Sequence, residues 1–138
     1  MPLEAGIAAE RTYTVTHEVT AAALGAREGA EGVALPAVWS TPDMIARMEI
    51  VSATLAAAHL ETAQMTVGSR NEISHLAATP VGAQVRVCSE LAAVDGRKLT
   101  FNVTAFDERE KVGEGIHIRY VVDRAKFDAK LREKSGPR

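Results

Sequence analysis

One long helical pattern, placed ahead of a run of strand patterns, most constrains what this chain can fold into. In "TPDMIARMEIVSATLAAAH", residues 41–59, apolar side chains recur at the spacing that lines one face of a helix. This apolar stripe consists of Met44, Met48, Val51 and Leu55, with Ile45, Ala53 and Ala56 beside it. An exposed stripe of this kind needs an apolar surface to cover it, which a sheet can supply.

The helix is expected to begin at Thr41. A threonine hydroxyl is a good N-cap, and Pro42 has no N–H group to leave unsatisfied in the first turn. Asp43 adds a negative charge at the positive end of the helix dipole. The sequence therefore predicts that Thr41 caps this helix.

Alternation with a period of two predicts strands on both sides of the helix. Ahead of it, residues 11–20 alternate Tyr and Val with Thr and Glu. After it, the chain returns through residues 61–70, with a break at Gly68, and alternates again over 71–78. Three more strand-like runs follow, at residues 83–94, 98–106 and 111–122. The Asp95-Gly96 pair between the first two of these runs predicts a hairpin.

The remaining segments look less regular. Residues 1–10 lack a clear period and are expected to be a loose lead-in. The Ala- and Gly-rich stretch 21–36 predicts a short helical turn and a flexible crossing segment. Residues 123–134 predict a short charged helix, and 135–138 a frayed tail.

These elements predict a single domain over residues 1–138, of the α+β class. Runs of strands beside a lone helix indicate an antiparallel sheet wrapped around one long central helix. This topology resembles the hot-dog fold. Subunits of that fold commonly pair, because one subunit alone leaves an edge strand and half of its site open.

Composition narrows the class of protein. A net charge of −2, without a run of Lys or Arg before the tail, argues against nucleic acid or an anionic membrane as the main partner. The single cysteine, Cys88, cannot form a disulfide within the chain. The sequence has no apolar stretch of about 18 residues and no secretory pattern at its start. We therefore expect a reduced, cytoplasmic protein.

Three side chains could carry chemistry. Glu49 lies among small and apolar helix residues. Burial there would raise the pKa of its carboxyl group, which suits a general base. The alternative interpretation is an ordinary helix glutamate whose side chain reaches solvent. Thr41 is either a simple cap or a hydroxyl beside free N–H groups that stabilise an oxyanion. His75 shares a strand face with apolar residues, as either a core residue or a catalytic one.

Other candidates are weaker. Arg119 is either a solvated strand charge or a ligand for a phosphate or a thioester carbonyl. The spacing of the four histidines, together with one cysteine, gives no zinc pattern. The sequence therefore predicts no metal site.

Four stretches together resemble the fluoroacetyl-CoA thioesterase family of hot-dog proteins. They are "PAVWSTPDMIARME", "TVGSRNEISHLAATPVG", "VDGRKLTFNVTAFD" and "VGEGIHIRYVV". The resemblance runs from about residue 36 to residue 134. It implies an acyl-CoA thioesterase that needs no cofactor, since CoA is part of the substrate, and a homodimer with its sites at the interface.

The resemblance also implies roles for particular residues. The catalytic threonine, glutamate and histidine of the family fall on Thr41, Glu49 and His75. Its substrate-binding glycine and arginine fall on Gly68 and Arg119. One departure concerns the crossing segment, where the fluoroacetyl-selective enzyme carries aromatic residues and this chain reads "EGVALP". The resemblance therefore implies thioester hydrolysis without assigning the acyl group.

Two other functions fit the same fold. One is a non-catalytic hot-dog module that binds an acyl-CoA or another small ligand. The other is a hydratase, which usually pairs an aspartate with a histidine, and no such pairing is found in this sequence. Turnover of a thioester would distinguish the thioesterase from both.

Overall fold

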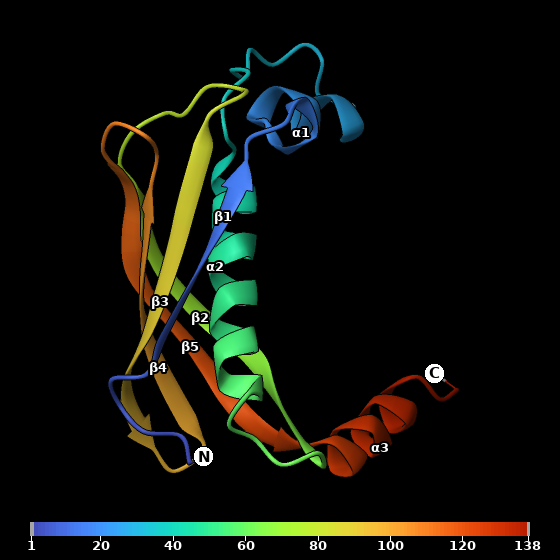
Figure 1. Ribbon diagram of the computed structural model, residues 1–138. Coiled ribbons are helices and arrows are strands. Elements are labelled where there is room, and N and C mark those ends of the chain that lie inside the picture. Colours follow the sequence, from blue (N-terminus) through green and yellow to red (C-terminus); the bar gives the residue numbers. More distant parts are fainter. Residues whose placement is uncertain (1, 138) are drawn as a thin grey trace.

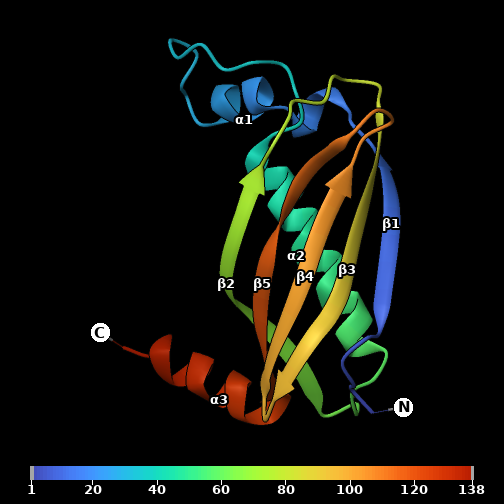
Figure 2. The same ribbon diagram turned by 90° about the vertical axis from the view of Figure 1, so that its left-hand side faces the viewer.

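The computed structural model describes residues 2–137, and in that range five antiparallel strands form one sheet in the order β1-β3-β4-β5-β2. The sheet curves around the long helix α2, as Figures 1 and 2 show. The strands are β1 (Ala8–Thr14), β2 (Gln64–His75), β3 (Gln84–Asp95), β4 (Lys98–Phe106) and β5 (Lys111–Asp123). This architecture confirms the predicted α+β arrangement.

Helix α2 (Thr41–Ala57) buries its apolar stripe against the inner face of the sheet. Met44 and Met48 are fully buried there, and burying each such side chain stabilises the fold by about 1.5–3 kcal/mol. The helix lies so close to β5 that a Cβ added at Gly113 would come within 2.5 Å of the sulfur of Met44. A glycine at this position therefore allows the close approach of helix and sheet.

The cap of α2 differs from the prediction. Ser40 is the N-cap, and its Oγ accepts a hydrogen bond from the backbone N–H of Asp43 at 3.1 Å. Thr41 is the first helical residue instead. Because Ser40 takes the capping role, the Thr41 hydroxyl is free to bond another group.

The first strand also differs from the prediction. It spans Ala8–Thr14, so residues 8–10 belong to the sheet and not to a loose lead-in. Residues beyond Val15 leave the sheet and form a short 3-10 turn, η1 (His17–Val19). The cause is Thr20, whose hydroxyl donates to the His17 carbonyl and accepts from the N–H of Ala23. These side-chain hydrogen bonds replace the strand ladder and begin helix α1 (Ala21–Arg27).

Strand β2 runs unbroken through Gly68 along one edge of the sheet. The predicted break is a bulge, where the pairing with β5 shifts between Gly68 and Arg70. The predicted hairpin at Asp95-Gly96 joins β3 to β4, with Gly96 in the left-handed region at φ 60°. The bulge follows Gly68, which faces Glu49 on α2.

The chain ends with helix α3 (Arg124–Lys134), which projects away from the sheet in both Figure 1 and Figure 2. Its bounds agree closely with the predicted helix at 123–134. Ser135 forms the C-cap of this helix, and the last residue of the predicted tail, 138, lies outside the described residues.

Candidate active site

The first part of the site is a hydroxyl–imidazole pair. Thr41, at the start of α2, and His75, the last residue of β2, come together so that Thr41 Oγ lies 2.7 Å from His75 Nδ1. Burial lowers the pKa of His75 below its ordinary value, so the ring is neutral near pH 7. Its Nε2 is buried and has no hydrogen-bond partner among the described residues. A neutral imidazole with one free nitrogen can give or take a proton.

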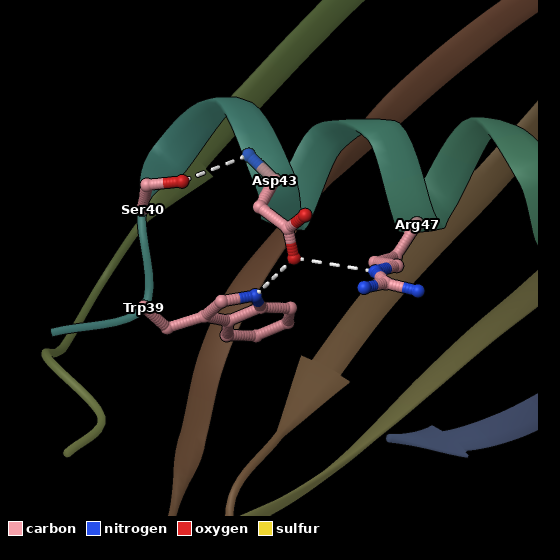
Figure 3. A network of polar contacts seen from close by, with 4 residues as sticks. All are labelled: Trp39, Ser40, Asp43 and Arg47. Carbon is pink, nitrogen blue, oxygen red and sulfur yellow. Dashed lines mark hydrogen bonds and ion pairs between the residues drawn. The ribbon is translucent and has the colours of Figure 1, made fainter. Parts of the chain in front are cut away.

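A network in the first turns of α2 supports this pair (Figure 3). Asp43 Oδ2 accepts hydrogen bonds from Trp39 Nε1 at 2.7 Å and from Arg47 Nε at 3.2 Å. The buried indole of Trp39 in turn meets the His75 ring edge-on, with centroids 6.3 Å apart. The first turn of α2 thus positions the two residues that contact His75, namely Thr41 and Trp39.

A cleft opens beside the pair. Its volume is about 480 Å³, and apart from Ser40, Thr41 and His75 its walls are apolar. Those walls are Ala21, Pro36, Val38, Trp39, Leu76, Ala77 and Ala78. An apolar group of a ligand can therefore lie next to the imidazole.

The second part of the site surrounds Glu49. This half-buried carboxylate lies eight residues after Thr41, about 12 Å farther along the helix. Asn71 on β2 donates a hydrogen bond from Nδ2 to Glu49 Oε2 at 2.8 Å. The amide holds one carboxylate oxygen and leaves Oε1 available on the side of Gly68.

Gly68 lies where three polar groups converge. A Cβ added there would be 3.2 Å from Arg119 Nη1, 3.5 Å from Glu49 Oε1 and 3.5 Å from His117 Cε1. Without that side chain, a small space remains between the carboxylate, the guanidinium and the backbone of β2. A polar part of a substrate could occupy it.

Arg119 is buried, which corrects the interpretation as a solvated strand charge. Burial lowers the pKa of its guanidinium, and the nearby Glu49 carboxylate acts in the opposite direction. His117, two residues away on the same face of β5, is also buried, and its pKa is lowered chiefly by burial. Both groups therefore face the helix.

The structure thus groups the five predicted site residues into two sets. Thr41 bonds His75, while Gly68 and Arg119 lie near Glu49, and no hydrogen bond among the described residues joins the two sets. Sequence reasoning missed Asn71, and it considered His117 only as one of the four histidines whose spacing gives no zinc pattern. The signal for His117 was its two-residue spacing from Arg119, which places both on one strand face.

Among residues 2–137, no three His, Cys, Asp or Glu side chains gather in a way that could hold a metal ion. None of the helices that the structure describes is long and apolar enough to cross a membrane.

Comparisons with known proteins agree with this architecture. The family model of the fluoroacetyl-CoA-specific thioesterases (FlK) matches residues 15–125. The fluoroacetyl-CoA thioesterase of Streptantibioticus cattleyicolor is 37% identical over 108 residues, which is 78% of each chain. A solved structure of FlK superposes with a TM-score of 0.89 at 31% identity, over 99% of this chain and 100% of that one.

A hot-dog-like protein from Thermanaerovibrio acidaminovorans shares the fold, with a TM-score of 0.83 at 21% identity, over 97% of this chain and 94% of that chain.

Taken with the fold and the site, the family match and the curated relative define a hot-dog thioesterase. The chain belongs to the fluoroacetyl-CoA-specific thioesterase family. The family resemblance stated from the sequence is confirmed, and so is the predicted thioester hydrolase class.

Proposed function

We propose that this thioesterase hydrolyses a small acyl-CoA to the free acid and CoA, with Thr41, Glu49 and His75 as its catalytic residues. One observation carries the proposal: Thr41 and Glu49 on α2 both point toward β2. On that strand His75 hydrogen-bonds Thr41, and Asn71 hydrogen-bonds Glu49. A hydroxyl, a carboxylate and an imidazole are the groups that acyl transfer to water requires.

Glu49 acts as the nucleophile or as the base that activates water. In either role the thioester C–S bond breaks, water supplies OH to the acyl group, and the sulfur leaves as a thiolate. Asn71 supports this role because it fixes one carboxylate oxygen and leaves the other toward Gly68. His75 takes up a proton that the attacking water releases and passes it to the departing thiolate, so the ring is neutral again at the end of the cycle. Thr41 orients the imidazole through its hydrogen bond.

Gly68 and Arg119 form the substrate-binding part of the proposal. The guanidinium is a cation beside the Glu49 carboxylate, where it can attract a thioester carbonyl or a CoA phosphate. The proposed reaction needs no metal and no cofactor apart from the CoA of the substrate.

We also propose a homodimer whose sites lie at the subunit interface. Edge strand β2 carries Gly68 and His75, and its outer edge is open to a second chain. Large apolar side chains near the site are half exposed, among them Ile50 and Leu76. The single, free Cys88 supports a reduced, cytoplasmic location.

The proposal names a small acyl-CoA and leaves fluoroacetyl selectivity out. The crossing segment ahead of α2 contains no aromatic side chain between residues 30 and 37, and its apolar residues Val33 and Leu35 are largely exposed. The crossing segment therefore has no aromatic side chain that could cover a two-carbon acyl group.

Release of free thiol from a panel of acyl-CoAs tests the proposal. The panel runs from acetyl, fluoroacetyl and propionyl esters to medium-chain and aryl esters. We expect turnover of at least one ester and a loss of about 100-fold or more in Glu49→Gln, because this change removes the base or nucleophile. Glu72→Gln is the matched control, since Glu72 is an exposed glutamate on β2, next to the Asn71 that bonds Glu49.

Two results would contradict the proposal. If the native chain turns over no ester but binds acyl-CoA, it is a binding module. If Glu49→Gln is as active as Glu72→Gln, the thioesterase class stands but Glu49 has no catalytic role.

A further inference from the structure

His117 is a buried polar side chain to which the proposed reaction assigns no role. It is fully buried on the inner face of β5, where its ring stacks on Phe101 with centroids 6.2 Å apart. Burying an imidazole costs free energy unless both ring nitrogens find partners. An apolar side chain could fill the same space beside Phe101 without that cost. The hydrogen bonds of His117 therefore need an explanation.

These hydrogen bonds fix the tautomer of His117. Arg119 Nη1 lies 3.2 Å from His117 Nε2, and a guanidinium can only donate, so Nε2 must be the acceptor. His117 Nδ1 lies 3.1 Å from the carbonyl oxygen of Arg70, which can only accept. The ring is therefore neutral, with its proton on Nδ1.

Arg119 is held on its other side by Thr66. Nε donates to Thr66 Oγ1 at 2.8 Å, and Nη2 donates to the Thr66 carbonyl at 3.1 Å. With His117 on Nη1, all three guanidinium nitrogens have a partner. The group is thus fixed in one orientation before any substrate arrives.

The bulge in β2 links this arrangement to the site. Thr66 precedes the bulge and Arg70 follows it, so Arg119 and His117 bind the strand on both sides of Gly68. The same Arg119 Nη1 that His117 holds is the atom nearest to a Cβ added at Gly68. The position of Nη1 therefore determines what fits between Arg119 and Glu49.

We propose that His117 is a positioning residue, which holds the Arg119 guanidinium at Gly68 beside Glu49 by accepting a hydrogen bond from Nη1. This inference rests on the proposed function, in which Arg119 meets the substrate. His117 itself does not touch the reacting atoms. Its removal should weaken substrate binding and turnover through Arg119 while the fold persists.

Two substitutions test this role. In His117→Leu the side chain keeps an apolar bulk but cannot accept from Arg119. In His117→Gln the amide can still accept from Arg119 through its oxygen and donate to the Arg70 carbonyl through its nitrogen. We expect kcat/KM to fall about tenfold or more in His117→Leu, the size of one hydrogen bond to a charged group, and to recover within about threefold in His117→Gln. His17→Leu, at an exposed position, is the control.

A second readout does not depend on activity. The Nη1–H signal of Arg119 in a nitrogen–proton correlation spectrum, assigned with Arg119→Lys, reports whether His117 holds the guanidinium, because Nη1 is the atom that donates to His117. We expect it to be protected from exchange in the native chain and in His117→Gln, and to broaden or vanish in His117→Leu. Thermal unfolding identifies variants that fail to fold.

The outcomes separate the two proposals. If the native chain is active and folded His117→Leu has native kcat/KM, the positioning role is overturned. It is also overturned if His117→Gln is as impaired as His117→Leu, because shape and not the acceptor would then matter. If no ester is turned over, the proposed function fails, and an unchanged Arg119 signal in His117→Leu would overturn the positioning role separately.

Discussion

The two ends of the site hold their side chains in opposite ways. At the Thr41 end, His75 has one hydrogen-bond partner, the exposed Thr41 hydroxyl, and its Nε2 has none among the described residues. At the Glu49 end, Arg119 and His117 are buried and bonded at every ring and guanidinium nitrogen. A proton carrier needs one free nitrogen, whereas a fixed charge stabilises best when it cannot move. The difference teaches that the two ends suit different parts of the proposed reaction, proton transfer at one and charge stabilisation at the other.

At the Thr41 end of the site, the largest expected effect comes from removing the free nitrogen of His75. His75→Asn should lower kcat by about 100-fold, the lower part of the range for a general acid or base, because a thiolate is a good leaving group. Rates of thiol release under saturating substrate measure this effect. The exposed His17→Asn serves as its control and should remain at native activity. Comparable rates for the two variants would remove His75 from the reaction.

A smaller effect is expected from the network that supports His75. Asp43→Ala leaves the buried Trp39 Nε1 without its acceptor, which should lower the free energy of unfolding by about 1–3 kcal/mol. Because Trp39 contacts the edge of the His75 ring, we expect kcat to fall only a few-fold. Asp43→Asn keeps an acceptor for the indole and is the matched control in urea unfolding and kinetics. A loss of activity as large as that of His75→Asn would show that the supporting network, and not the free nitrogen, limits catalysis.

The smallest effect is a dependence of stability on pH. Burial lowers the pKa of His117 and His75 below their ordinary value of 6.5, so on acidification the unfolded chain takes up protons first. Stability is therefore unaffected by these groups above pH 6.5 and falls as the pH drops below it, by at most about 1.4 kcal/mol per pH unit for each histidine. Urea unfolding between about pH 5 and 8 measures this slope.

Substitution of His117 shows which of the two histidines causes this dependence of stability on pH. His117→Gln should remove the part that comes from the Glu49 end and leave the part that comes from His75. A native slope in His117→Gln would place the whole effect elsewhere in the molecule.

Local pattern was sufficient for most of the elements. The spacing of Met44, Met48, Val51 and Leu55 predicted α2, and strict alternation predicted β3, β4 and β5, because these residues bury the same faces that their periods define. The pattern failed at Ser40 and at residues 15–20, where side-chain hydrogen bonds decide between helix, turn and strand. Such bonds depend on geometry that a periodic pattern does not contain.

The sequence by itself determined the α+β fold, the family and the residues Thr41, Glu49, His75, Gly68 and Arg119 as candidates, because those follow from local periodicity and from a motif in register. Only the tertiary structure decided that Asn71 holds Glu49 and that His117 holds Arg119. Asn71 is 22 residues away from Glu49 in the chain, and the Arg70 carbonyl that fixes the His117 tautomer is 47 residues away from that ring. The bulge and the strand register bring these groups together, and a hydrogen bond forms only between atoms that the fold has already placed within reach.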